Sequence, residues 1–227
     1  MKFIRINPYT IGLVFKDGVY KHMLKEGKYW LKFSETVMIY DMTKQFSAPC
    51  QLNILLQDAE LAHALHVIEV KEGEIVLQYE NGLLNQVLTA GRYTFWKGVM
   101  QYEFIRADIS QIAIPQNIDR ATLLSKPVIG FVRTYTVEAF ERGVLYVDGK
   151  FEKVLESGVY YWWKNSIAIH VAKVDVRQQQ MEINGQEILT KDKAALRINA
   201  WAQYKVTNIE KAILENKEWD KQLYVSF

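Results

Sequence analysis

The chain has 227 residues, 49% of them hydrophobic, which is enough for one large or two small folded domains with a sizeable core. Its 28 Lys and Arg nearly balance its 26 Asp and Glu, a charge that neither requires nor excludes nucleic acid or an anionic membrane as a partner. We predict no nucleic-acid partner. The lone Cys50 cannot form an internal disulfide and is typical of a reducing compartment. No apolar run has the length of a signal peptide or of the roughly 20 residues that span a bilayer. We therefore expect a cytoplasmic protein, with any membrane contact peripheral and at the inner face.

One short sequence pattern occurs three times along the chain. Each copy has a strand-forming run, a hairpin dipeptide, then Leu-x-x-Gly, a tyrosine two positions later, and a tryptophan. The copies are Gly12 to Trp30, Gly73 to Trp96 and Gly143 to Trp162. The dipeptides are Asp17-Gly18, Asn81-Gly82 and Asp148-Gly149, which tolerate the positive φ of a type I′ turn. An internal repeat of this kind predicts a scaffold of β-hairpin modules.

The modules are expected to alternate with short helices. After each second glycine another β-rich stretch follows, which adds a third strand to the hairpin. The segments 57–65 and 117–124 are rich in helix formers and predict two short helices. We therefore predict an α+β fold of antiparallel β-rich modules, divided as residues 1–66, 67–135 and 136–227.

The third copy continues into the clearest alternation in the chain. From Leu196 to Val206, apolar and polar side chains alternate, which predicts a half-buried strand. The spacing of Thr207 and Glu210 is that of a capping box, and it predicts a helix over Ile209 to Asn216. Beyond it, Trp219, Leu223 and Phe227 share one face of a further predicted helix.

The residues from the third copy onward resemble a known family. The ordered stretches are Val137 to Lys150, Leu155 to Tyr160, Val174 to Met181, Ile188 to Lys193 and Tyr204 to Ala212. Together they resemble the SPFH (stomatin, prohibitin, flotillin) or Band 7 domain over about residues 136 to 227, and most closely the bacterial stomatin-like proteins called slipins. The resemblance implies a curved antiparallel sheet with packed helices, in a membrane-associated scaffold that assembles into oligomers.

Two departures from that family bear on function. Stomatin-like proteins usually begin with a hydrophobic membrane segment, whereas here two further copies of the opening module stand in its place. The family also usually continues into long helical or coiled-coil segments, so the chain is expected to stop before such a region. The resemblance implies a homo-oligomer in full-length form, with a membrane surface or membrane proteins as partners.

No motif for catalysis or cofactor binding occurs in the sequence. It has no phosphate-binding loop, dinucleotide fingerprint or metalloprotease motif, and we predict no enzyme activity, cofactor, metal or small-molecule substrate. His63 and His66 could share the face of a short helix, but they lack further ligands. Asp41, Asp108 and Asp175 occupy comparable places in the three copies, which indicates a turn or cap.

The candidate contact with a partner or membrane is the aromatic run Tyr161, Trp162 and Trp163. Neighbours in a strand face opposite sides, so one of them should be exposed. Two functions follow. The first is a non-enzymatic, stomatin-like scaffold that self-associates and organises membrane-linked complexes. The alternative is a soluble multi-module protein whose aromatic-rich β modules hold a peptide or polymer.

Overall fold

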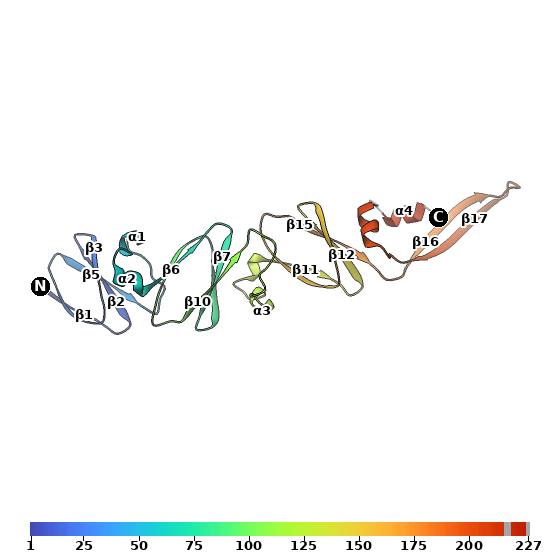
Figure 1. The fold of residues 1–227 in the computed structure, drawn as a ribbon. Helices are drawn as coiled ribbons and strands as arrows, with labels where there is room; N and C mark the ends of the chain where they lie inside the picture. The colour runs from blue at the N-terminus through green and yellow to red at the C-terminus, as the bar shows by residue number, and fades with distance from the viewer. Residues whose placement is uncertain (216–218, 226–227) are drawn as a thin grey trace. The chain divides into compact units, whose positions relative to one another are not determined.

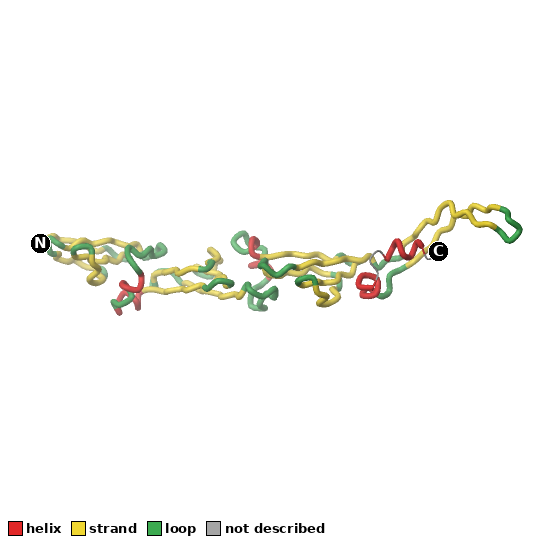
Figure 2. Tube along the Cα trace, turned by 90° about the horizontal axis from the view of Figure 1, so that it is seen from above, coloured by secondary structure: helices red, strands yellow, loops and turns green. Residues whose placement is uncertain are grey.

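The computed structural model describes residues 1–215 and 219–225. It divides into two compact units, the first of residues 1–110 with 115–129 and the second of residues 111–114 with 130–227. Two copies of a five-stranded antiparallel module make up most of the first unit, and a third copy lies in the second unit (Figure 1). The helices lie in the connections that join successive modules and near the carboxyl terminus (Figure 2). The predicted α+β fold of repeated hairpin modules is confirmed.

The strands of the three modules follow in chain order. The first module has β1 (Lys2–Ile6), β2 (Thr10–Lys16), β3 (Val19–Leu24), β4 (Gly27–Leu31) and β5 (Glu35–Asp41). The second has β6 (Leu65–Val70), β7 (Glu74–Glu80), β8 (Leu83–Leu88), β9 (Gly91–Trp96) and β10 (Tyr102–Asp108). The third has β11 (Val132–Val137), β12 (Glu141–Val147), β13 (Lys150–Leu155), β14 (Gly158–Trp163) and β15 (Ile169–Asp175).

Each module pairs its strands in the same way. The first strand pairs with the fourth, and the second pairs with both the third and the fifth, so a two-stranded sheet packs on a three-stranded one. Neither the first nor the fourth strand of each module was predicted as a separate element. The expected boundaries at residues 67 and 136 therefore fall inside β6 and β11.

The repeated leucine and glycine have clear structural roles. The leucine of Leu-x-x-Gly ends the third strand and joins a core of four buried residues, one from each of the first four strands. These cores are Ile6, Val14, Leu24 and Leu31; Val70, Val76, Leu88 and Phe95; and Val137, Leu145, Leu155 and Trp162. At Gly27, φ is +156°, and a Cβ added to this residue would lie only 3.1 Å from the Tyr29 ring. The tyrosine two positions after the glycine is therefore a packing partner of the bare backbone.

The hairpin turns also match their prediction. Asp17 and Gly18 both have positive φ, at 52° and 79°, and Lys16 pairs with Val19 across the turn. This is the two-residue geometry of a type I′ turn. The other two dipeptides have φ values within a few degrees of these. All three hairpins thus turn in the same way.

Two short helices connect the first module to the second. They are α1 (Leu52–Leu55) and α2 (Ala59–Ala64), and the carboxylate of Asp58 caps α2 by accepting from the backbone N–H of Glu60 at 2.9 Å. In the next connection, α3 (Arg120–Leu123) is capped by Asp119 and is followed by a 3₁₀ turn, η1 (Ile129–Phe131). Both predicted helices exist, in shorter form than predicted.

A long hairpin follows the third module. It consists of β16 (Gln179–Leu189) and β17 (Ala195–Tyr204), with a π-helical turn η2 (Lys211–Glu215) and α4 (Trp219–Val225) after it. The predicted alternation is confirmed in β17, where Ala200, Ala202 and Tyr204 are half-buried between exposed neighbours. The helical turn is capped by Asn208, whose Oδ1 accepts from the N–H of Lys211, instead of by Thr207. Asn216 and Phe227, expected in the two helices, lie outside the described residues.

Candidate functional site

The same turn ends each module. The carboxylate of Asp41, Asp108 or Asp175 accepts a hydrogen bond from the backbone N–H two residues later, at 2.9, 2.8 and 2.9 Å. Side-chain hydrogen bonds from Thr43, Ser110 and Arg177, together with these backbone ones, favour the ionised carboxylate and hold the pKa of all three groups below the usual range. The prediction of a repeated structural turn is confirmed.

In the third module this turn carries an additional charged contact. Arg177, the residue that follows the turn, pairs with Asp175, its Nε lying 3.0 Å from each carboxylate oxygen. Its guanidinium carbon also lies 3.9 Å from the centre of the Phe140 ring. Thr43 and Ser110 occupy the equivalent positions in the other modules, so this stacked ion pair is specific to the third copy.

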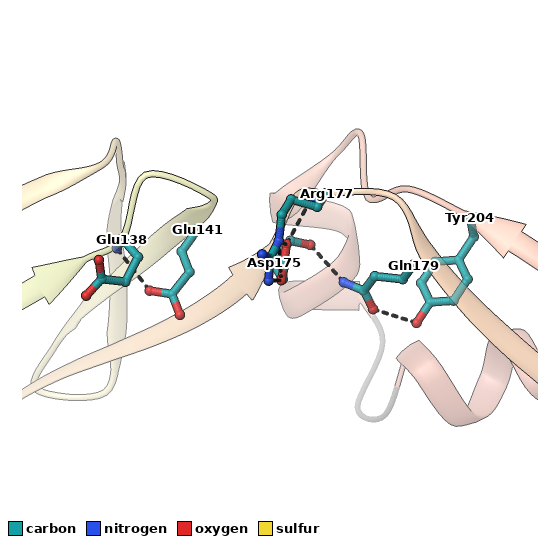
Figure 3. Close-up of polar contacts among 6 residues, drawn as sticks. All are labelled: Glu138, Glu141, Asp175, Arg177, Gln179 and Tyr204. Atoms are coloured by element: carbon teal, nitrogen blue, oxygen red, sulfur yellow. Dashed lines mark hydrogen bonds and ion pairs between the residues drawn. The ribbon is translucent and has the colours of Figure 1, made fainter.

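Polar side chains continue the contact into the base of the long hairpin. Gln179 donates from Nε2 to the backbone carbonyl of Asp175 at 3.1 Å, and the Tyr204 hydroxyl donates to Oε1 of Gln179 at 2.7 Å. Glu141 accepts from the N–H of Glu138 at 3.0 Å (Figure 3). We interpret this set as a joint, because Gln179 and Tyr204 link the end of β15 to β16 and β17, and Arg177 ties the intervening turn to Asp175 and Phe140.

The hairpin beyond this joint presents apolar side chains to solvent. Trp201 is 62% exposed, and Leu189 and Leu196 are also exposed. By strand alternation Trp201 and Leu189 share one face of the hairpin, opposite the half-buried side chains of Ala200 and Ala202. An exposed tryptophan on such a hairpin indicates a surface suited to association.

The predicted aromatic contact site is mostly interior. Trp162 is 8% exposed, in the module core against Tyr135 and Tyr160, with ring centres 5.4 and 5.8 Å away. Trp163 points the other way and is fully buried, and Tyr161 is half-buried. The alternation argument was correct about direction but wrong about exposure, because both faces of β14 are covered. Tyr161 is the one residue of the three with a side chain partly open to solvent.

The two histidines do not share a face. His63 is exposed at the end of α2, whereas His66 lies in β6 beside the rings of Tyr102 and Phe104, where burial lowers its pKa. Within residues 1–215 and 219–225 no three His, Cys, Asp or Glu side chains gather as metal ligands would. In the same part of the chain, no helix has the length and apolar character needed to cross a membrane.

A module of paired antiparallel sheets, repeated and then extended by a long hairpin and short helices, defines the class of this protein as an α+β repeat protein. Comparison with known families identifies its carboxyl-terminal part: residues 135–224 match the SPFH domain / Band 7 family. The resemblance to the Band 7 family inferred from the motifs is thereby confirmed, whereas the closeness to slipins stays a prediction; the match covers most of the third module, the joint and the hairpin.

Two similar proteins support this assignment. A band 7 family protein of Acanthamoeba polyphaga mimivirus is 27% identical over 74 residues, which is 33% of this chain and 24% of that protein. An uncharacterized protein of Methanocaldococcus jannaschii is 32% identical over 87 residues, which is 37% of this chain and 41% of that protein. The match thus spans less than half of either relative.

Sequence reasoning missed the joint, although a signal for it was present. The turns that end the three modules each begin with an aspartate, but they differ two residues later. There the third module has Arg177 in place of a small residue with a hydroxyl group. A residue that differs from its equivalents in the other copies of a repeat indicates a position with a role specific to that copy. The stacking of that arginine on Phe140 depends on a tertiary contact that the spacing does not reveal.

Proposed function

We propose that this protein is a non-enzymatic, stomatin-like scaffold that self-associates and organises membrane-linked protein complexes. The observation that carries the proposal is the SPFH/Band 7 match over residues 135–224, built directly onto the third copy of a repeated β module. The Band 7 family generally serves as scaffold and not as enzyme, and the slipin branch fits the motif order best. The two preceding modules then extend the scaffold.

The long hairpin is the proposed self-association surface. Trp201 and Leu189 are exposed and, by strand alternation, share the face of the hairpin opposite its half-buried side. Covering them with a second copy would remove apolar area from water and stabilise the hairpin. The full-length protein is therefore proposed to form a homo-oligomer through this element.

Light scattering on the full-length protein tests this proposal. We expect a defined oligomer, and we expect Trp201→Gln to shift it toward smaller species as the protein is diluted. Trp30→Gln is the matched control, because Trp30 is 65% exposed and also lies in a two-stranded antiparallel pair. A protein that stays monomeric at every concentration would contradict self-association. An oligomer equally sensitive to both substitutions would contradict the role of the hairpin.

The proposed location is the cytoplasm, peripheral at the inner face of a membrane. Fractionation of cells that express the native full-length protein should place it with membranes or membrane proteins. Recovery entirely in the soluble fraction, with no associated membrane protein, would contradict the membrane-linked part of the proposal.

A second candidate function is the holding of a peptide or polymer by the β modules. It is favoured by a cavity of about 480 Å³ beside the first module, lined by Tyr9, Met23, Met42, His63 and Val99 among others. The exposed Tyr9 and the methionines suit an extended apolar segment. Entirely soluble native protein that retains a peptide ligand, and loses it on Met42→Glu substitution, would favour this function over the scaffold.

A further inference from the structure

The three modules place equivalent residues on the outward face of their two-stranded sheets. In the second module this face carries Trp96 and Thr94, which are both buried. The connection that contains α1 and α2 covers it: the backbone N–H of Phe46 donates to the carbonyl of Thr94, and the Thr94 hydroxyl donates to the carbonyl of Phe46 at 2.9 Å. In the second module this face is therefore covered.

The first module leaves the equivalent face open. Counting from the glycine that begins the fourth strand, Trp30 corresponds to Thr94, and it lies opposite Phe3 on β1. The Phe3 and Trp30 rings meet edge to face with centres 5.2 Å apart, yet Trp30 is 65% exposed and Phe3 49%. Phe33, in the turn that follows β4, is 90% exposed. Two large aromatic side chains thus project together into solvent on this face, and a third is exposed in the adjoining turn.

The charges on this face are unusual as well. Arg5 lies directly opposite Lys28, and by strand alternation both share the face of Phe3 and Trp30. The equivalent pair in the second module is Glu69 and Arg92, which form an ion pair at 3.0 Å. In the first module, two cations stand where the second module pairs opposite charges and the third has the uncharged Thr136 and Val159. Across residues 1–215 and 219–225, neither Arg5 nor Lys28 takes part in an ion pair.

The exposed side chains of this face stand on well-packed strands, as the opposite side of the same strands shows. Ile6 and Leu31 point inward and are buried in the module core. The outward residues are therefore held on a fixed sheet, in a fixed register. Two more exposed lysines, Lys2 and Lys32, flank the face. Like charges placed opposite one another cost stability unless something neutralises them.

We propose that this aromatic-basic face, made of Phe3, Arg5, Lys28 and Trp30 and adjoined by Phe33 in the next turn, binds an anionic lipid surface. Tryptophan and phenylalanine favour the boundary between headgroups and acyl chains, while lysine and arginine are attracted to anionic headgroups. A second copy of the same face is a poor occupant, since it would bring four cations together. The inference rests on the membrane-linked role proposed above and names the surface that provides it.

Vesicle sedimentation with the full-length protein tests the face. The vesicles are phosphatidylcholine alone, or phosphatidylcholine mixed with phosphatidylserine in equal parts. We expect binding to the mixed vesicles that weakens as salt is raised. The double substitution Arg5→Gln and Lys28→Gln should lower the partition coefficient roughly 30-fold, as two basic residues lost from an anionic surface would. Trp30→Gln with Phe33→Gln should also lower it.

Matched controls use exposed residues of other modules. Lys150→Gln with Lys153→Gln removes the same charge from β13, and Leu83→Gln removes an exposed apolar side chain from β8. Neither should change binding by more than about twofold. All these substitutions are at exposed positions, so circular dichroism melts should coincide with that of the wild type.

Three results would overturn the inference. They are no binding to either vesicle, equal binding to both, or equal losses for the controls and the face variants. If the protein sediments with cell membranes yet binds no vesicle, a membrane protein and not the lipid is its partner, and the inference is wrong. Light scattering separates this failure from that of the scaffold. Oligomers that persist in a protein without vesicle binding would refute the lipid face alone.

Discussion

Replacing Trp96 by alanine tests whether the first two modules share one core. Trp96 ends β9 and is fully buried, and its ring centre lies 4.8 Å from that of Phe46 in the connection between the modules. The same cluster contains Leu13 of β2 and Leu61 of α2. Loss of the indole should therefore loosen both modules together.

The size of the effect follows from burial. A buried tryptophan removes about 150–250 Å² from water, worth about 4–6 kcal/mol as an upper figure at about 25 cal/mol per Å². Aromatic-to-alanine substitutions in cores cost about 3–5 kcal/mol. The Nε1–H of Trp96 is buried and has no hydrogen-bond partner among the described residues. Because alanine also removes that unpaired donor, whose burial costs about 1–3 kcal/mol, we expect about 3 kcal/mol. Trp96→Phe keeps a ring against Phe46, and we expect it to cost about 1 kcal/mol or less.

Urea unfolding combined with hydrogen exchange and mass spectrometry measures both parts of this prediction. The lost free energy comes from the unfolding midpoints, and amide exchange should quicken in β2 as well as in β6 and β9. Trp30→Ala is the control, since an exposed tryptophan should change stability by about 0.5 kcal/mol or less. If exchange in β2 stays at the wild-type rate, each module has an independent core. A loss below about 1 kcal/mol for Trp96→Ala would refute the burial argument.

Two further predictions concern the third module. Hydrogen bonds from Arg177 lower the pKa of Asp175, so its stabilisation is complete above the unfolded value of about 3.9 and is lost as pH falls through the lower folded value. Asp175→Ala should therefore lower the urea midpoint near neutral pH, with a difference from wild type that shrinks in acid; a constant difference would contradict this. A Cβ at Gly143 would lie 3.1 Å from methyl groups of Val137 and Val171. Gly143→Ala should cost about 1–2 kcal/mol, or a few degrees of melting temperature, and an unchanged melt would contradict the close packing.

Local signals in the sequence were sufficient for the turns. Asp17-Gly18 and its two equivalents need positive φ at both positions, a demand set by the dipeptide itself and independent of the rest of the fold. The structural role of the aspartates in the turns that end the modules could be predicted for a similar reason, because their carboxylates accept a hydrogen bond from the backbone two residues away. Structural features that depend on only a few consecutive residues are therefore the easiest to predict from a repeated sequence.

The first strand of each module was harder to predict. Residues 65–70 directly follow α2 without a glycine or proline to separate them, so the end of the helix and the start of β6 read as one segment. The partner of β6 is β9, more than twenty residues later, and nothing local indicates that pairing. The fourth strand, which pairs only with the first, was missed together with it, so the sequence predicted a three-stranded hairpin unit where the structure has five strands.

The aromatic residues show how the same limit affects the search for a site. Equivalent positions in β4, β9 and β14 hold Trp30, Thr94 and Tyr161, so the repeat conserves the face but not its chemistry. The most aromatic copy was the natural candidate from the sequence, and it is mostly buried, whereas Trp30 in the least conspicuous copy is exposed. Burial at these positions is decided by the connection packed on each face, as Phe46 is packed on Thr94, and not by the strand itself. A functional surface in a repeat protein is thus best sought where one copy lacks the cover that another copy has, and the lipid-binding test applies this reasoning to the first module.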